Sequence, residues 1–309
     1  MAFTMHSHSG QFCPGHAVDQ LEDIIQQAIK LGFKTIGLSE HMPRYEEQDL
    51  YLEELSDPKA SLASMHPLHE AYLLESQRLQ TKYAPQIHIL IGLEAEFIRP
   101  SYGPLVKQLL LAPSIDYFIG SVHHVHSIAI DYDHAKYAAA LAASGGDEQR
   151  LHEDYYDLQH EMLLTLRPRV VGHFDLIRLK SESPDRDVTQ WRGVWAKVLR
   201  NLKLVREQGG WLELNTAALR KGLKEPYPCR AIAEEWVQMG GQFTMSDDSH
   251  GIAQVGTNYA RGLAYLESLG VRNVWTFERK PHPGPDGATR AILSDKAVPL
   301  EAFREHFKS

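Results

Sequence analysis

The chain has 309 residues, 43% of them hydrophobic and 23% charged, and its net charge is −8 when histidine is neutral. This acidic balance, without any run of lysine and arginine, argues against a nucleic-acid partner, and no apolar stretch approaches the roughly 20 residues of a membrane helix. The two cysteines, Cys13 and Cys229, exclude a disulfide framework and fit a reducing compartment. Because no basic and then apolar leader opens the chain, we expect a cytoplasmic protein.

The hydrophobic pattern predicts strands and helices that alternate along almost the whole chain. Runs of apolar and β-branched residues predict the strands, and apolar residues at helical spacing predict the helices between them. The predicted strands are 3–5, 34–39, 87–93, 115–122, 169–172, 211–214 and 242–245, with a further candidate at 271–277. The predicted helices are 17–31, 67–83, 104–111, 151–166, 190–207, 228–239 and 259–269.

This alternation predicts an α/β protein with a parallel sheet, because consecutive strands joined through a helix run in the same direction. Seven such units in one chain favour a closed TIM-like barrel over an open sheet. The chain has no repeat, low-complexity tract or long linker, so we expect a single domain over residues 1–309. Two parts lack a clear pattern, an excursion at 127–150 and a proline- and glycine-rich tail from about 278 to 309.

Side chains that bind metals follow almost every predicted strand. His6 and His8 end the first strand, where the alternation of an extended chain points both imidazoles to the same side. The C-terminal strand ends of a parallel barrel meet at one face, so residues from distant parts of the chain would share one mouth. The candidates at the strand ends and in the first loop are His6, His8, His16, His41, Glu94, His123, His173, Asp248 and His250.

These nine donors are more than one ion needs, because a catalytic metal takes three or four protein ligands and keeps a position open for water. They suit two or three ions, which could hold the attacking and leaving oxygens of a phosphate ester or, less often, act on an amide. No GxGxxG or GxxxxGK[ST] motif indicates a nucleotide site. Alternatives stay open for four positions: His41 and His173 as core residues, Glu96 in place of Glu94, and Asp247 in place of Asp248.

A phosphate substrate also needs cations for its non-bridging oxygens, and arginine can bind a phosphate through two parallel hydrogen bonds. We expect Arg178, in the loop after His173, and Arg220, after the sixth strand, to bind the phosphate. Arg44 and Lys221 are weaker candidates, for which a solvated loop charge is the simpler interpretation.

Short motifs around the candidate ligands form a specific set that runs from His6 to about Ala264. They are His6-Ser7-His8, His16, Ser39-Glu40-His41, Gly92-Leu93-Glu94, Ser121-Val122-His123-His124 with Asp131-Tyr132-Asp133, Gly172-His173-Phe174-Asp175 and Ser246-Asp247-Asp248-Ser249-His250. Together they resemble the PHP (polymerase and histidinol phosphatase) superfamily, and most closely its monofunctional histidinol-phosphate phosphatase branch of the fungal type.

The resemblance implies a distorted (β/α)7 barrel that holds a trinuclear site, with zinc, iron or manganese as the metal. All nine ligand positions of the family are occupied in this sequence. By this resemblance, His6, His8, Glu94 and Asp248 would bind one metal, His16, His41 and His250 a second, and Glu94, His123 and His173 a third.

The resemblance also implies a small-molecule substrate, L-histidinol phosphate, hydrolysed to L-histidinol and phosphate in histidine biosynthesis. In the expected mechanism a metal-bound hydroxide attacks phosphorus in line, with Glu94 and Asp248 as the catalytic carboxylates. The leaving-group acid (a metal-bound water or Asp247) and the partner of the substrate amine (Glu96 or Glu213) stay open. The alternatives are another phosphoesterase of the superfamily, acting on a nucleotide or a small phosphorylated metabolite, and a metal-binding module without activity.

Overall fold

The computed structural model describes residues 1–283 and 289–307 and is built around seven parallel strands. The first and last strands also lie side by side, because Met5 N donates to Met245 O at 3.1 Å. The sheet is therefore a nearly closed barrel, which confirms the predicted TIM-like (β/α)7 architecture. In order around the barrel the strands are β1 (Phe3–Thr4), β2 (Thr35–Leu38), β3 (His88–Glu96), β4 (Tyr117–Ser121), β7 (Val170–Val171), β8 (Trp211–Asn215) and β9 (Gln242–Ser246).

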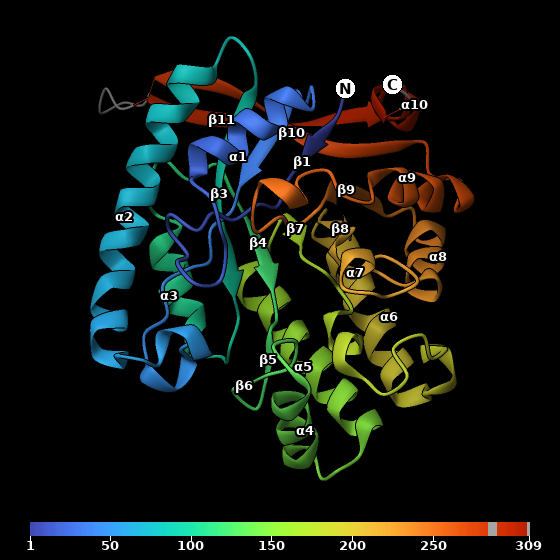
Figure 1. Ribbon diagram of the computed structural model, residues 1–309. Coiled ribbons are helices and arrows are strands. Elements are labelled where there is room, and N and C mark those ends of the chain that lie inside the picture. Colours follow the sequence, from blue (N-terminus) through green and yellow to red (C-terminus); the bar gives the residue numbers. More distant parts are fainter. Residues whose placement is uncertain (284–288, 308–309) are drawn as a thin grey trace.

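Helices connect consecutive strands and lie on the outside of the barrel (Figure 1). In α1 (Leu21–Lys30), Leu21, Ile24, Ile25 and Ala28 share one face of the helix and are buried, which is why this segment packs as a helix. No helix in the described part of the chain has both the length and the apolar composition needed to cross a membrane. The other connecting helices are α2 (Pro58–Tyr83), α3 (Tyr102–Leu109), α5 (Glu148–Leu166), α6 (Arg192–Glu207), α7 (Ala217–Arg220), α8 (Arg230–Gln238) and α9 (Tyr259–Ser268).

A tyrosine fills the interior of the barrel on the side away from the strand C-termini. Tyr117, the first residue of β4, reaches across to the residue that follows β1, where its hydroxyl donates to Met5 O at 2.5 Å. Gly92 leaves room for this ring, because a Cβ atom there would lie 2.6 Å from a ring carbon of Tyr117. The strand ends that carry the polar residues therefore rest on a packed interior.

The segment between β2 and β3 differs from the expectation of a helix that begins at residue 67. The helix α2 begins at Pro58, because proline suits a first helical turn and Asp57 caps it by accepting a hydrogen bond from Ala60 N. Pro67 lies inside this helix. Two short 3₁₀ helices precede it, η1 (Glu47–Asp49) and η2 (Leu52–Glu54).

The excursion expected at 127–150 contains regular elements of its own. β5 (His124–Val125) and β6 (Ile128–Ala129) form a small antiparallel pair, and α4 (His134–Ala143) follows. Asp133 caps α4 by accepting a hydrogen bond from Lys136 N. This part of the chain extends beyond the C-terminal end of β4 (Figure 1), which brings the residues between β6 and α4 to the mouth of the barrel.

The residues expected as a C-terminal tail form in part a hairpin that covers the opposite end of the barrel. β10 (Asn273–Pro283) pairs antiparallel with β11 (Thr289–Pro299), and α10 (Leu300–Arg304) follows. Phe277 stacks on Trp211, the first residue of β8, with ring centroids 4.6 Å apart. The hairpin therefore packs on the N-terminal ends of the strands. Two pieces of the expected tail, 284–288 and 308–309, lie outside the described residues.

We expect Phe277→Ala to lower the free energy of unfolding by about 3–5 kcal/mol, because Phe277 is 4% exposed and its loss leaves a cavity under the hairpin. The denaturant midpoint of the metal-loaded protein measures this change. Ile292→Ala is the control on the same hairpin, since Ile292 is 52% exposed and should cost less than about 1 kcal/mol. Equal losses in the two variants would contradict the role of the hairpin.

Candidate metal centre

The C-terminal strand ends surround a cavity of about 530 Å³. All nine predicted donors lie at this end of the barrel, on its wall or directly behind it. Eight of them form three groups in which one ligand atom from each residue lies within 4.8 Å of the others. The three groups are His6, His8 and Asp248; Glu94, His123 and His173; and His8, His41 and His250.

The first group combines the two histidines after β1 with a carboxylate after β9. The predicted alternation of His6 and His8 is confirmed, because their ring centroids lie 4.9 Å apart on the same side of the chain. Asp248 reaches them from a left-handed turn, with φ at 49°. Arg220 stabilises this turn by donating to the carbonyl oxygens of Asp247 and Asp248 at 2.8 and 2.9 Å.

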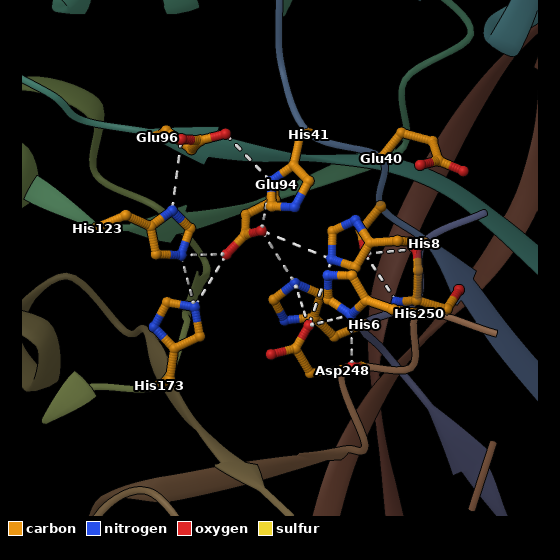
Figure 2. A network of polar contacts seen from close by, with 12 residues as sticks. His6, His8, Glu40, His41, Glu94, Glu96, His123, His173, Asp248 and His250 are labelled. Carbon is orange, nitrogen blue, oxygen red and sulfur yellow. Dashed lines mark hydrogen bonds and ion pairs between the residues drawn. The ribbon is translucent and has the colours of Figure 1, made fainter. Parts of the chain in front are cut away.

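The second group is built on Glu94, which ends the buried strand β3. Glu94 Oε1 lies 3.0 Å from His173 Nε2 and 3.3 Å from His123 Nε2. Its other oxygen, Oε2, lies 3.3 Å from His6 Nε2, so the carboxylate stands between two donor groups (Figure 2). This position fits the bridging role that the resemblance implies for Glu94.

The third group differs in one member from the set that the resemblance implies. It contains His8 in the place expected for His16, whose ring centroid lies 5.1 Å from those of His41 and His250. His16 is partly exposed at the rim, and its Nδ1 donates to Glu53 Oε1 at 2.8 Å. That hydrogen bond leaves Nε2 of His16 as the nitrogen available to a metal.

The hydrogen bonds of the imidazoles fit metal ligation. A histidine that binds a metal typically donates its other ring nitrogen to a carboxylate. Within the described residues, buried nitrogens without a hydrogen-bond partner include Nε2 of His6, His8 and His41, and such atoms cost free energy that a cation would recover. Nδ1 of His6 donates to Glu213 at 2.7 Å and Nδ1 of His16 to Glu53 at 2.8 Å, whereas Nδ1 of His41 and of His123 face Glu96 at 3.1 and 3.5 Å without a hydrogen bond.

Burial and neighbouring charges set the protonation of these donors. Burial, together with the charges on His41 and His6, lowers the pKa of His8 to about 3, so this imidazole is neutral, as a metal ligand must be. Burial opposes ionisation of Glu94, but the charges on His6 and His123 outweigh it and hold the pKa of Glu94 well below its usual range. An ionised, buried carboxylate among histidines is a suitable site for a divalent cation.

Glu213 and Glu96, the two candidates for binding a substrate amine, are fully buried behind the histidines. Glu213 accepts hydrogen bonds from His6 Nδ1 and from His173 N, the latter at 2.8 Å. Glu96 contacts the Nδ1 atoms of His41 and His123. Both carboxylates lie against the far sides of candidate ligand side chains, so neither is positioned to meet a substrate.

Arg178 does not occupy the position predicted for it, which corrects the expectation that it binds a phosphate. Its Nε donates to Asp175 Oδ2 at 2.8 Å, and its Nη2 donates to the carbonyl oxygens of Glu225 and Pro226 at 3.0 and 2.7 Å. These bonds tie the loop after β7 to the loop after β8. Arg178 borders a separate, smaller cavity instead of the mouth.

Asp247 is also a structural residue, which removes it as a candidate leaving-group acid. It is fully buried, and it accepts hydrogen bonds from Thr4 Oγ1, Ser249 N and Gly256 N. These bonds fix the turn that presents Asp248.

Among the described residues, the lysines and arginines that line the mouth are Lys180, Arg220 and Lys221. Arg220 and Lys221 were candidates from the sequence, but Lys180 was not. The sequence could have indicated Lys180, because it lies in the same loop as His173. Arg178 lies in that loop too, and the sequence alone did not show which of the two positive charges faces the mouth. Arg44 turns away from the mouth, with its guanidinium 4.0 Å from the ring centre of Tyr51 and paired with Glu54.

Comparison with known proteins agrees with this arrangement. Residues 4–217 match the PHP domain family. The chain is 42% identical over 288 residues to the probable histidinol-phosphatase of Schizosaccharomyces pombe, which covers 93% of this chain and 92% of that protein. It is 30% identical to the histidinol-phosphatase of Saccharomyces cerevisiae, over 96% of each chain.

A solved structure shares the fold. The crystal structure of histidinol phosphate phosphatase from Lactococcus lactis, complexed with zinc, L-histidinol and phosphate, matches with a TM-score of 0.66 and covers 89% of this chain and 96% of that one. The two sequences are 18% identical, so this likeness concerns the fold alone.

We expect Glu213→Gln to weaken metal binding by about 10- to 100-fold, because the amide cannot accept all the hydrogen bonds that hold His6 and the backbone of His173. Titration of the apo-protein with zinc against a chromophoric chelator measures the affinity. Glu161→Gln is the matched control, since Glu161 is exposed on α5, away from the mouth. Unchanged affinity in Glu213→Gln would show that this carboxylate does not support the site.

Proposed function

The chain belongs to the PHP domain family, and we propose that it is a metal-dependent phosphatase that hydrolyses L-histidinol phosphate to L-histidinol and phosphate in histidine biosynthesis. One observation carries this proposal: Glu94 stands between two groups of metal donors in a cavity that also contains lysine and arginine side chains. The substrate is supported by the two yeast relatives, each similar over more than nine tenths of this chain.

We propose that the three donor groups hold two or three divalent ions of zinc, iron or manganese. When bound, such ions polarise phosphoryl oxygens and lower the pKa of a water molecule. The zinc in the Lactococcus lactis structure supports this class of metal. His6, His8 and Asp248 would hold one ion, Glu94, His123 and His173 another, and His41 and His250 a third, with His8 or His16.

The protein's own side chains supply both negative and positive charge at the mouth. Without bound metal, the charge on His6 outweighs burial and holds the pKa of Glu94 and of Asp248 well below its usual range; with His6 as a neutral ligand, divalent ions in the donor groups would supply that positive charge instead. Arg220, Lys180 and Lys221 share the cavity and can neutralise the non-bridging oxygens of a phosphate as charge builds on them. Arg220 has a second role, because it also donates a hydrogen bond that stabilises the turn of Asp248.

The remaining expectations belong to the same proposal. A single domain over residues 1–309, a cytoplasmic location and the absence of a nucleic-acid partner all suit an enzyme for a small phosphate ester. The support is the acidic net charge of −8 and two cysteines that are both free.

The metal-loaded protein should release phosphate from L-histidinol phosphate, and far faster than from a sugar phosphate or a dinucleotide. Chelation should abolish this activity and a divalent metal should restore it. We expect His123→Ala to lower kcat/KM by about 100-fold or more while the circular dichroism spectrum is unchanged. Preferential hydrolysis of a nucleotide would indicate another phosphoesterase, and failure to hydrolyse even p-nitrophenyl phosphate would indicate a metal-binding module.

We expect Lys221→Met to lower kcat/KM for L-histidinol phosphate by about 10- to 100-fold, the cost of one charge-assisted hydrogen bond, without loss of bound metal. Lys224→Met is the control, because Lys224 lies three residues further along with a side chain 81% exposed and paired with Asp185. Steady-state kinetics and elemental analysis of both variants measure the difference. Equal activity in the two would remove Lys221 from the phosphate site.

A further inference from the structure

The cavity must distinguish its substrate from other phosphate esters, and L-histidinol phosphate differs from most of them by an ammonium group next to the ester carbon. Resting on the proposed function, we propose that Asp131 binds this ammonium group and makes the enzyme selective for amino-alcohol phosphates. The carboxylates that line the cavity in the described residues are Glu94, Asp131 and Asp248. Glu94 and Asp248 belong to the donor groups, which leaves Asp131 for the substrate.

Asp131 lies beside the second donor group. It follows β6, and the preceding residue, Ile130, donates its backbone N–H to His123 O at 2.9 Å. A phosphate bound to an ion that Glu94, His123 and His173 would hold would therefore place the neighbouring ammonium group close to this carboxylate. No hydrogen bond or ion pair within residues 1–283 and 289–307 engages the Asp131 side chain, so it is free to accept one.

The two residues that follow Asp131 are both held in place. Tyr132 donates to Glu53 Oε2 at 2.9 Å, and Glu53 in turn accepts from His16. Asp133 caps α4 by accepting a hydrogen bond from Lys136 N. A carboxylate held in this way loses little conformational freedom when it binds a cation, which favours selectivity.

The charges around the cavity match a molecule with two opposite charges. The cations Lys180, Arg220 and Lys221 follow β7 and β8, whereas Asp131 follows β4 and its short hairpin. The substrate would then span the mouth in one orientation, with its phosphate at the cations and its ammonium group at Asp131. Glu53, at the same rim, is already used by His16 and Tyr132.

The test compares two substrates that differ only in the amine, L-histidinol phosphate and imidazolylpropyl phosphate. The wild-type protein should prefer the amine by about 10- to 100-fold in kcat/KM, the value of a hydrogen bond between charged groups. Asp131→Asn should lose most of this preference through a lower kcat/KM for L-histidinol phosphate alone. Its rate with imidazolylpropyl phosphate and its metal content should stay at the wild-type values.

Asp133→Asn is the matched control, because asparagine also caps a helix and Asp133 is two residues away. It should keep the preference for the amine. Equal loss with both substrates in Asp131→Asn, or an unchanged preference, would overturn the inference while the proposed function stands. Absence of turnover of L-histidinol phosphate by the wild-type protein, with other phosphate esters hydrolysed, would overturn the proposed function and this inference with it.

Discussion

The mouth of the barrel depends on the burial of one carboxylate, Glu94, among imidazoles. A buried charge costs several kcal/mol unless opposite charges compensate it. Burial raises the pKa of Glu94, but contacts with His6, His123 and His173 on its two sides outweigh this effect and hold the pKa well below its usual range. The strands that deliver these histidines are therefore coupled through a single side chain, and divalent ions between the groups would complete the compensation.

The site could be predicted from the sequence to the extent that it follows strand geometry. His6 and His8 face the same way because they alternate on an extended chain, and the C-terminal ends of parallel strands must converge. Neither argument needs tertiary information. Both fail for residues deeper in a loop, such as Arg178, whose guanidinium is captured by the carbonyl oxygens of Glu225 and Pro226, nearly fifty residues further along the chain.

The fold shows the same division between local and distant causes. The barrel strands carry their own signal because they are buried on both faces and read as continuous apolar runs. The hairpin of β10 and β11 carries no such signal, because its inward residues alternate with charged ones. The surface on which it packs is the N-terminal end of the barrel, whose strands come from earlier parts of the chain. Phe277 is identifiable as a core residue only once Trp211 is known to lie beneath it.

Strand alternation also accounts for how the candidate ligands are held. Glu94 and Glu96 are two residues apart on β3 and point to the same side, so the first meets the inward nitrogen of His123 and the second contacts its outward nitrogen. One strand thereby supplies both a candidate ligand and the carboxylate that orients its neighbour. The sequence left Glu94 and Glu96 as alternatives for one ligand position, but the geometry gives the two residues complementary roles. The pattern Glu-x-Glu at a strand end is thus best interpreted as a pair.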